Sequence, residues 1–172
     1  MTSVSRTPST PVDALPVVFL AALLFSGAAQ PSVRVAPMDS VGPRPVEKQT
    51  QSSVVRDYLQ AWQTLGSAFS QSRADLLEGY FVGIAKEKLT DTIREQQNLG
   101  IQTIYRDESH DLQVVFYSPE GLSIQLLDNV EYEIEVRDQG KTVGTQHVRT
   151  RCVAVLTPTE SSWKVRVFQG GT

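Results

Sequence analysis

Apolar and polar residues alternate along residues 122–137 and again along residues 141–156. Successive side chains leave a strand on opposite faces, so this period of two predicts strands with one buried face. In both segments the even positions are mainly apolar and the odd positions mainly polar. We therefore expect two antiparallel strands that share a buried even face and expose an odd face to water.

The pairing of these two strands depends on the turn between them, which contains a glycine. A two-residue loop would place even positions opposite odd ones and would bury charged side chains. We therefore expect a three-residue loop, Asp138–Gly140, whose glycine supplies the left-handed residue of a type I turn with a G1 bulge. This register pairs Val130 with Val148 and Glu131 with His147.

A second turn upstream has a similar composition. Pro119–Gly121 also ends in a glycine, and a three-residue loop at this position pairs Phe116 with Ile124. Two such turns predict a meander of consecutive antiparallel strands. The expected strands are residues 101–107, 112–118, 122–137, 141–156 and 162–169.

Three helical segments precede the strands. Apolar side chains recur every three or four residues along residues 51–69, which is typical of a helix with one buried face. A short helical turn is expected at residues 74–78 and a longer helix at residues 84–98, with Gly100 as its C-terminal stop. Helices followed by a long antiparallel meander predict an α+β fold, in which the helices pack on a curved sheet as a roll or cone.

The first 50 residues have a different character. Residues 14–29, "ALPVVFLAALLFSGAA", form an apolar run that is short for a membrane span but typical of a signal peptide. We expect residues 1–29 to direct export as a signal peptide or membrane anchor that contacts the membrane, so that the protein is periplasmic or otherwise extracytoplasmic. Residues 30–50 contain four prolines and predict a semi-extended linker before a domain at residues 51–172.

Composition excludes several classes of function. The net charge of −3 gives no basic surface of the kind that nucleic-acid binding requires. A single cysteine, Cys152, cannot form an internal disulfide, and its even position predicts a small buried side chain. The two histidines are not spaced as metal ligands, and no nucleotide-binding motif is present, so neither a metal site nor a cofactor is expected.

The order of helices and strands, closing with "SSWKVRVF", resembles the nuclear-transport-factor-2-like superfamily. The segment "ADLLEGYFVGIAKEKLTDTIREQQNLGIQTIY" is similar to exported bacterial members and to the C-terminal domain of plastid- and cyanobacterial-division scaffolds. The resemblance covers roughly residues 54–168 and implies an α+β cone. It also implies two kinds of function, because the superfamily includes SnoaL-like and ketosteroid-isomerase-like enzymes that place an acid and tyrosines inside the cone.

One carboxylate interrupts the apolar even face. In the expected register this residue, Asp128, lies on the same face as His110, Tyr132, Gln146 and Thr150. These five side chains would bind a small ligand in the cone, and in an enzyme Asp128 would act as general base with Tyr132 and His110 nearby. The Asp-Asn pair favours a different interpretation over this pocket, because it commonly breaks strands: Asp128 and Asn129 would mark a strand bulge that turns Asp128 to the rim.

The odd face carries the charged side chains Glu131, Glu133, His147 and Arg149. Such rows on an exposed sheet face are usually solvated charge pairs, each worth tenths of a kcal/mol. The same four residues could also form an interface with a protein partner or a second copy of the chain.

The sequence is compatible with two functions. One is a non-catalytic binding or scaffold module, exported or membrane-tethered, that binds a protein partner or a small apolar ligand in its cone. The other is a small cofactor-independent lyase or isomerase that uses Asp128 as its base.

Overall fold

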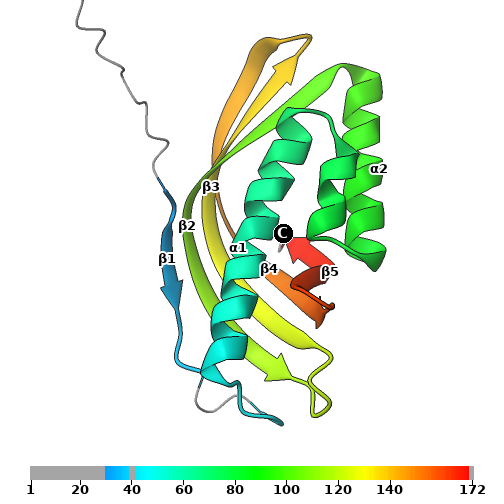
Figure 1. Ribbon diagram of the computed structural model, residues 1–172. Coiled ribbons are helices and arrows are strands. Elements are labelled where there is room, and N and C mark those ends of the chain that lie inside the picture. Colours follow the sequence, from blue (N-terminus) through cyan, green and yellow to red (C-terminus); the bar gives the residue numbers. More distant parts are fainter. Residues whose placement is uncertain (1–29, 39–41, 171–172) are drawn as a thin grey trace, which may run out of the picture.

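The computed structural model describes residues 30–38 and 42–170 (Figure 1). Its elements are β1 (Ser32–Val35), α1 (Lys48–Ser70), the 3-10 helix η1 (Ala74–Gly79), α2 (Gly83–Leu99), β2 (Ile101–Tyr117), β3 (Ile124–Asp138), β4 (Lys141–Pro158) and β5 (Trp163–Gly170). The strands form one sheet in the order β1-β2-β3-β4-β5, in which only β1 runs parallel to its neighbour. Helices followed by a curved, largely antiparallel sheet confirm the expected α+β roll.

The core lies between the helices and one face of the sheet. Both long helices lie on the same side of the curved strands (Figure 1), and we call the sheet face toward α1 the inner face and the opposite one the outer face. The apolar stripe of α1, from Val54 to Phe69, is buried. It packs against even-numbered residues of the sheet, such as Leu126 and Val130, which are fully buried. Cys152 is also buried on this face, as expected for a small apolar side chain.

The helix ends follow their local sequence. Gly100 adopts the left-handed conformation, with a φ of 72°, directly after α2. Its backbone N–H donates to the carbonyl of Gln97 near the end of the helix. A residue with a Cβ is disfavoured in this conformation, so the glycine ends the helix where the sequence predicted.

The hairpin between β3 and β4 differs from the expected register. Its loop is the two-residue Gln139–Gly140, with φ angles of 47° and 81° that suit a type I′ turn. An extra residue in β4, Val143, then forms a bulge and restores the match between the apolar faces. As a result Val130 pairs with Thr150, and the predicted pairing of Val130 with Val148 is wrong by two residues.

The upstream hairpin also differs. The side-chain oxygen of Ser118 accepts hydrogen bonds from the backbone N–H groups of Leu122 and Ser123, at 3.0 and 3.1 Å, and so holds a longer loop than expected. Phe116 therefore pairs with Gln125 and not with Ile124. The prediction missed this loop because the serine, in addition to the glycine, determines where the strands separate.

The two expected strands at residues 101–107 and 112–118 are one continuous strand, β2. A bulge at Glu108 separates Asp107, which pairs with Tyr132, from Ser109, which pairs with Glu131. The bulge changes which positions of β2 point inward, and this change of pattern made the strand resemble two strands in the sequence.

The segment expected to be a linker contributes to the domain. Ser32–Val35 adds a strand to the edge of β2, and Met38 is buried in the core. The apolar run at residues 14–29, expected to direct export, lies outside the described residues. Among the residues that are described, none of the helices combines the length and hydropathy needed to cross a membrane.

Candidate functional site

The inner face holds a buried network of three polar side chains. Asp128 of β3 is completely buried, and its Oδ2 atom accepts a hydrogen bond of 2.9 Å from the Tyr58 hydroxyl of α1. The same oxygen lies 2.8 Å from Nδ1 of His110 on β2, which is 2% exposed. The second ring nitrogen of His110 lies 3.8 Å from the carboxylate of Asp107. Four residues from one helix and two strands therefore meet inside the cone.

Charge and burial set the protonation of this network. Burial lowers the pKa of His110, but the interactions of its ring with the carboxylates of Asp107 and Asp128 outweigh this effect and raise the pKa to about 9. Burial, followed by the charge of Asp128, raises the pKa of Tyr58 well above its ordinary value. At neutral pH the network thus contains a protonated imidazole and a neutral phenol, both in contact with the Asp128 side chain.

Aromatic rings fill the space around the network. Trp62 packs at 5.4 Å between ring centroids against His110, at 5.7 Å against Tyr132 and at 5.4 Å against Phe168. Tyr132 in turn lies 5.7 Å from Tyr105. These rings come from α1 and three strands, and Trp62 and Tyr105 also line a surface pocket of about 290 Å³ that Asp107 borders.

The structure unites some of the predicted site residues and separates others. Asp128, His110 and Tyr132 all lie on the inner face, but Gln146 is exposed and pairs with Ile134. Thr150 lies opposite Val130, while Cys152 takes the expected place of Thr150 opposite Asp128. The two-residue change in hairpin register accounts for both differences.

The favoured interpretation, a bulge that turns Asp128 to the rim, is wrong. Asp128 pairs in regular register with Leu112 and Cys152 and has no exposed surface. Its interactions with His110 and Tyr58 offset the cost of burying a carboxylate. Bulges occur instead on β2, at Glu108 and at Val115.

Sequence reasoning missed Tyr58, Trp62 and Asp107 as members of the site. Tyr58 and Trp62 were assigned only to the apolar stripe of the first helix, although they lie one turn apart on the side that faces the sheet. The hydroxyl of Tyr58 and the indole N–H of Trp62 were the features of the sequence that could have indicated a polar contact inside the fold. Asp107 had no such signal, because it points inward only as a result of the bulge at Glu108.

Three buried polar atoms in this region have no hydrogen-bond partner among the described residues: Trp62 Nε1, His110 Nε2 and Asp128 Oδ1. His110 also borders two surface pockets. One, of about 230 Å³, lies where β1 approaches α1 and includes Val33 and Leu59. The other, of about 400 Å³, includes Ser32, Arg34 and Arg149. The network is therefore buried but lies close to the surface at the β1 edge.

The outer face carries the expected row of charged side chains. Glu131 pairs with Arg149 at 2.5 Å, whereas the predicted register placed it opposite His147. His147 lies 2.7 Å from Glu108, and Glu133 forms an ion pair with Arg106. His147 and Arg149 are exposed, while Glu131 and Glu133 are partly exposed. These contacts are surface ion pairs, in agreement with the solvated row that the sequence indicates.

A third acid of β3, Glu135, has more hydrogen-bond partners than these residues. Its carboxylate accepts hydrogen bonds from Thr142 and Arg137, both at 2.7 Å, and from Arg106 at 2.5 Å. These bonds lower the pKa of Glu135 to about 2. It ties the end of the β3–β4 hairpin to β2.

No protein-family model and no curated protein matches this sequence. Solved structures do match its fold. The intermembrane space region of the chloroplast protein ARC6 superposes with a TM-score of 0.59 over 74% of this chain and 98% of that one, at 18% identity. A protein from Novosphingobium aromaticivorans named as a scytalone dehydratase gives 0.51, over 73% and 89% of the two chains, at 9% identity. These likenesses show a shared α+β roll, the fold that the resemblance to the nuclear-transport-factor-2-like superfamily implies.

This identification concerns the fold alone, because all of these identities are low. The two similar structures are described differently: one is a region of a chloroplast protein, and the other is named as an enzyme. The fold therefore accommodates both functions that the sequence leaves open.

Proposed function

We propose that this domain is a non-catalytic protein-binding module. The observation that carries the proposal is the complete burial of Asp128. A general base must reach the proton that it removes, either directly or through one water molecule. In this protein Tyr58 and His110 both contact the carboxylate, and Trp62 packs against the His110 ring.

Because the inner acid is enclosed, we look to the surface of the sheet as the place for a partner. On the outer face Leu127 pairs with Val153 in one row, and Val155 pairs with Val167 in the next. All four side chains are partly exposed. We call these four residues the outer apolar patch. Apolar side chains beside charged ones are the usual composition of a protein interface, with a dry centre and a polar rim.

A second copy of the chain is the partner that we propose for this patch. On the adjoining outer face, β2 and β3 carry more acidic than basic side chains, with Arg106 and Arg137 among the acids, whereas β4 carries the basic residues His147, Arg149 and Arg151. A two-fold contact requires a surface that complements itself. Rotation of one sheet on another would bring the acidic row of each copy toward the basic row of the other, with the outer apolar patch between them.

Sedimentation equilibrium of the full chain tests this proposal. We expect a dimer that V155E converts to a monomer, because a carboxylate at the centre of the patch would be buried without a partner. The matched control is V143E, which makes the same change at a valine that is 63% exposed in the hairpin bulge. A monomeric wild-type chain, or equal effects of the two substitutions, would contradict the dimer.

The alternative function, a small lyase or isomerase, has its own supporting observation. Trp62 Nε1, His110 Nε2 and Asp128 Oδ1 are three unpaired polar atoms in one buried region, and such groups can mark a catalytic site. Deuterium exchange into small enolisable ketones, followed by NMR, separates the two functions. Exchange that is accelerated by wild-type protein and lost in D128N would establish an enzyme. Absence of acceleration would agree with a binding module.

We also propose that the domain acts outside the cytoplasm. The support is the composition of residues 14–29, an apolar run of signal-peptide size. A reporter that is active only after export should be active when it is fused after Thr50. An inactive reporter in an intact fusion would contradict export.

A further inference from the structure

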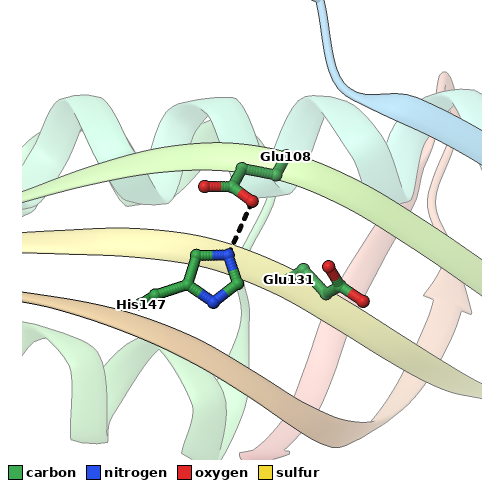
Figure 2. Close-up of side chains that lie close together, drawn as sticks. All are labelled: Glu108, Glu131 and His147. Carbon is green, nitrogen blue, oxygen red and sulfur yellow. Dashed lines mark hydrogen bonds and ion pairs between the residues drawn. The ribbon is translucent and has the colours of Figure 1, made fainter.

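Three side chains on the outer face lie close together. They are Glu108 of β2, Glu131 of β3 and His147 of β4, and their ligand atoms all lie within 4.8 Å of one another. Figure 2 shows these side chains gathered on the surface of the sheet. The imidazole Nε2 atom of His147 lies 2.7 Å from Oε2 of Glu108.

The backbone brings these residues together in a specific way. Glu108 is the extra residue of the β2 bulge, which adds a side chain between Asp107 and Ser109. Glu131 pairs with Ser109, the next residue of β2. Bulges often redirect a side chain toward a functional position. Here the bulge directs a carboxylate toward an imidazole that projects from β4, the second strand over.

One imidazole nitrogen and two carboxylate oxygens are ligands that first-row divalent metal ions accept. We propose that Glu108, Glu131 and His147 form a binding site for such an ion, with Zn²⁺ as the reference metal. Zinc bonds to these atoms are roughly 2.0–2.2 Å long, so tetrahedral ligand atoms lie about 3.3 Å apart. The present spacings, from 2.7 Å up to 4.8 Å, bracket this value.

The side chains have the freedom to close around an ion. The exposed fractions are 45% for Glu108, 28% for Glu131 and 54% for His147. Arg149, which pairs with Glu131, is 75% exposed and can return to water when the ion takes its place. The ion would neutralise two carboxylates that lie on neighbouring strands.

A neighbouring pocket gives the site an accessible side. The pocket of about 400 Å³ includes Glu131 and Arg149, together with Arg34, Ser109 and Asn129. Three protein ligands leave at least one zinc coordination position open, as in catalytic rather than structural zinc sites. Water or an anionic group in the pocket would complete the coordination. The site does not depend on the dimer proposed above.

The histidine spacing in the sequence gave no indication of this site, because its ligands come from three different strands. Such ligands have no fixed separation along the chain. The only local signal is the acidic segment around Glu108, between two residues that the bulge points to opposite faces.

Zinc titration of the full chain by calorimetry tests the proposal. We expect one ion per chain and a loss of affinity of at least about ten-fold in H147Q and in E108Q, because weaker perturbations of metal sites already cost this much. The matched control is E133Q, which removes the same charge as E108Q from the same face. Glu133 lies opposite His147 in the backbone register of β3 and β4. The affinity of E133Q should stay within two-fold of wild type.

Two results would overturn the site. One is the absence of stoichiometric zinc binding by the wild-type chain. The other is binding that H147Q leaves unchanged, or that Mg²⁺ matches in strength, since both would show that an imidazole ligand is not involved. Circular dichroism checks that each variant is folded. If H147Q alters the spectrum, E108Q and E133Q provide the decisive comparison.

Discussion

The protein contains two histidine–carboxylate pairs with nearly the same separation on opposite faces of one sheet. His110 lies 2.8 Å from Asp128 on the inner face, and His147 lies 2.7 Å from Glu108 on the outer face. The inner pair is 2% and 0% exposed, whereas the outer side chains are 54% and 45% exposed. Distance alone therefore does not determine what such a pair contributes. The surrounding solvent does.

Burial changes the consequence of removing either member of a pair. Inside the cone, a charged group that loses its partner cannot be solvated, so the free energy of unfolding decreases. On the outer face, water and salt replace a lost partner at little cost. We therefore expect the inner pair to determine the stability of the fold and the outer pair to remain available for ligands.

The largest effect is expected for D128A. This substitution leaves the His110 imidazolium and the Tyr58 hydroxyl buried without their shared acceptor. Removal of one partner from a buried ion pair typically costs about 3–5 kcal/mol, so the free energy of unfolding in urea should decrease by about this amount. E108A removes the acid of the outer pair and serves as the control. A loss below about 1 kcal/mol in D128A would show that the inner network contributes little.

The second prediction concerns alkaline pH. The pKa of His110 is about 9 in the folded protein, against an ordinary value of 6.5. Between these values the folded state binds more protons than the unfolded state, so stability decreases as pH rises. The contribution of His110 is fully present below about pH 6.5 and is lost as the pH passes through about 9. The titratable groups that face His110 are Asp107 and Asp128 from the sheet and Tyr58 from α1.

The shift corresponds to roughly 3 kcal/mol lost between these pH values, as an order of magnitude. Unfolding measured at several pH values should show this decrease for wild type and for H147Q. In H110Q the decrease should be largely absent. Equal pH profiles for wild type and H110Q would mean that His110 does not carry the extra proton.

The third prediction concerns Glu135 and unfolding at acidic pH. Its pKa is lowered to about 2 by bonds from Thr142, Arg137 and Arg106. Its contribution is therefore present above about pH 4.5 and is lost as pH falls toward 2. We expect E135Q to weaken the pH dependence of unfolding in this range, whereas E120Q, at an exposed loop position, should leave it unchanged. Identical acid unfolding of wild type and E135Q would contradict this role.

The sequence was sufficient for the fold but only partly sufficient for the site. Alternation placed Val130 on the buried face correctly, because burial of apolar side chains tolerates no change of face, whereas the bulge favoured at Asp128 is absent. A shift by two residues keeps every side chain on its face, so the pattern could not distinguish pairing with Thr150 from pairing with Val148. The turn type and the Val143 bulge decided this register.

Bulges limited the prediction in a second way. The odd residues Asp107 and Ser109 point to opposite faces because Glu108 is inserted between them. After such an insertion, odd and even positions of the strand exchange faces, so alternation no longer predicts which side chains are buried. The neighbours of His110 on one face and of His147 on the other were both hidden for this reason.

The smallest effect is expected for the double variant E131Q/H147Q. The Glu131–Arg149 and His147–Glu108 pairs both lie in contact with water, and exposed pairs contribute roughly 0–1 kcal/mol each. Without added metal, the melting temperature should therefore remain close to that of wild type. High salt should reduce even this small difference, because salt screens exposed charges.

The same variant separates the possible functions of the outer face. Loss of self-association with an unchanged melting temperature would place these side chains in the contact between two copies. Loss of zinc binding with unchanged association would restrict them to the metal site. Unfolding of the variant would contradict both proposals, because it would show that the outer pair is as essential to the fold as the inner one. The expected outcome is a stable monomer fold in which only ligand or partner binding changes, since the outer pair remains in contact with solvent.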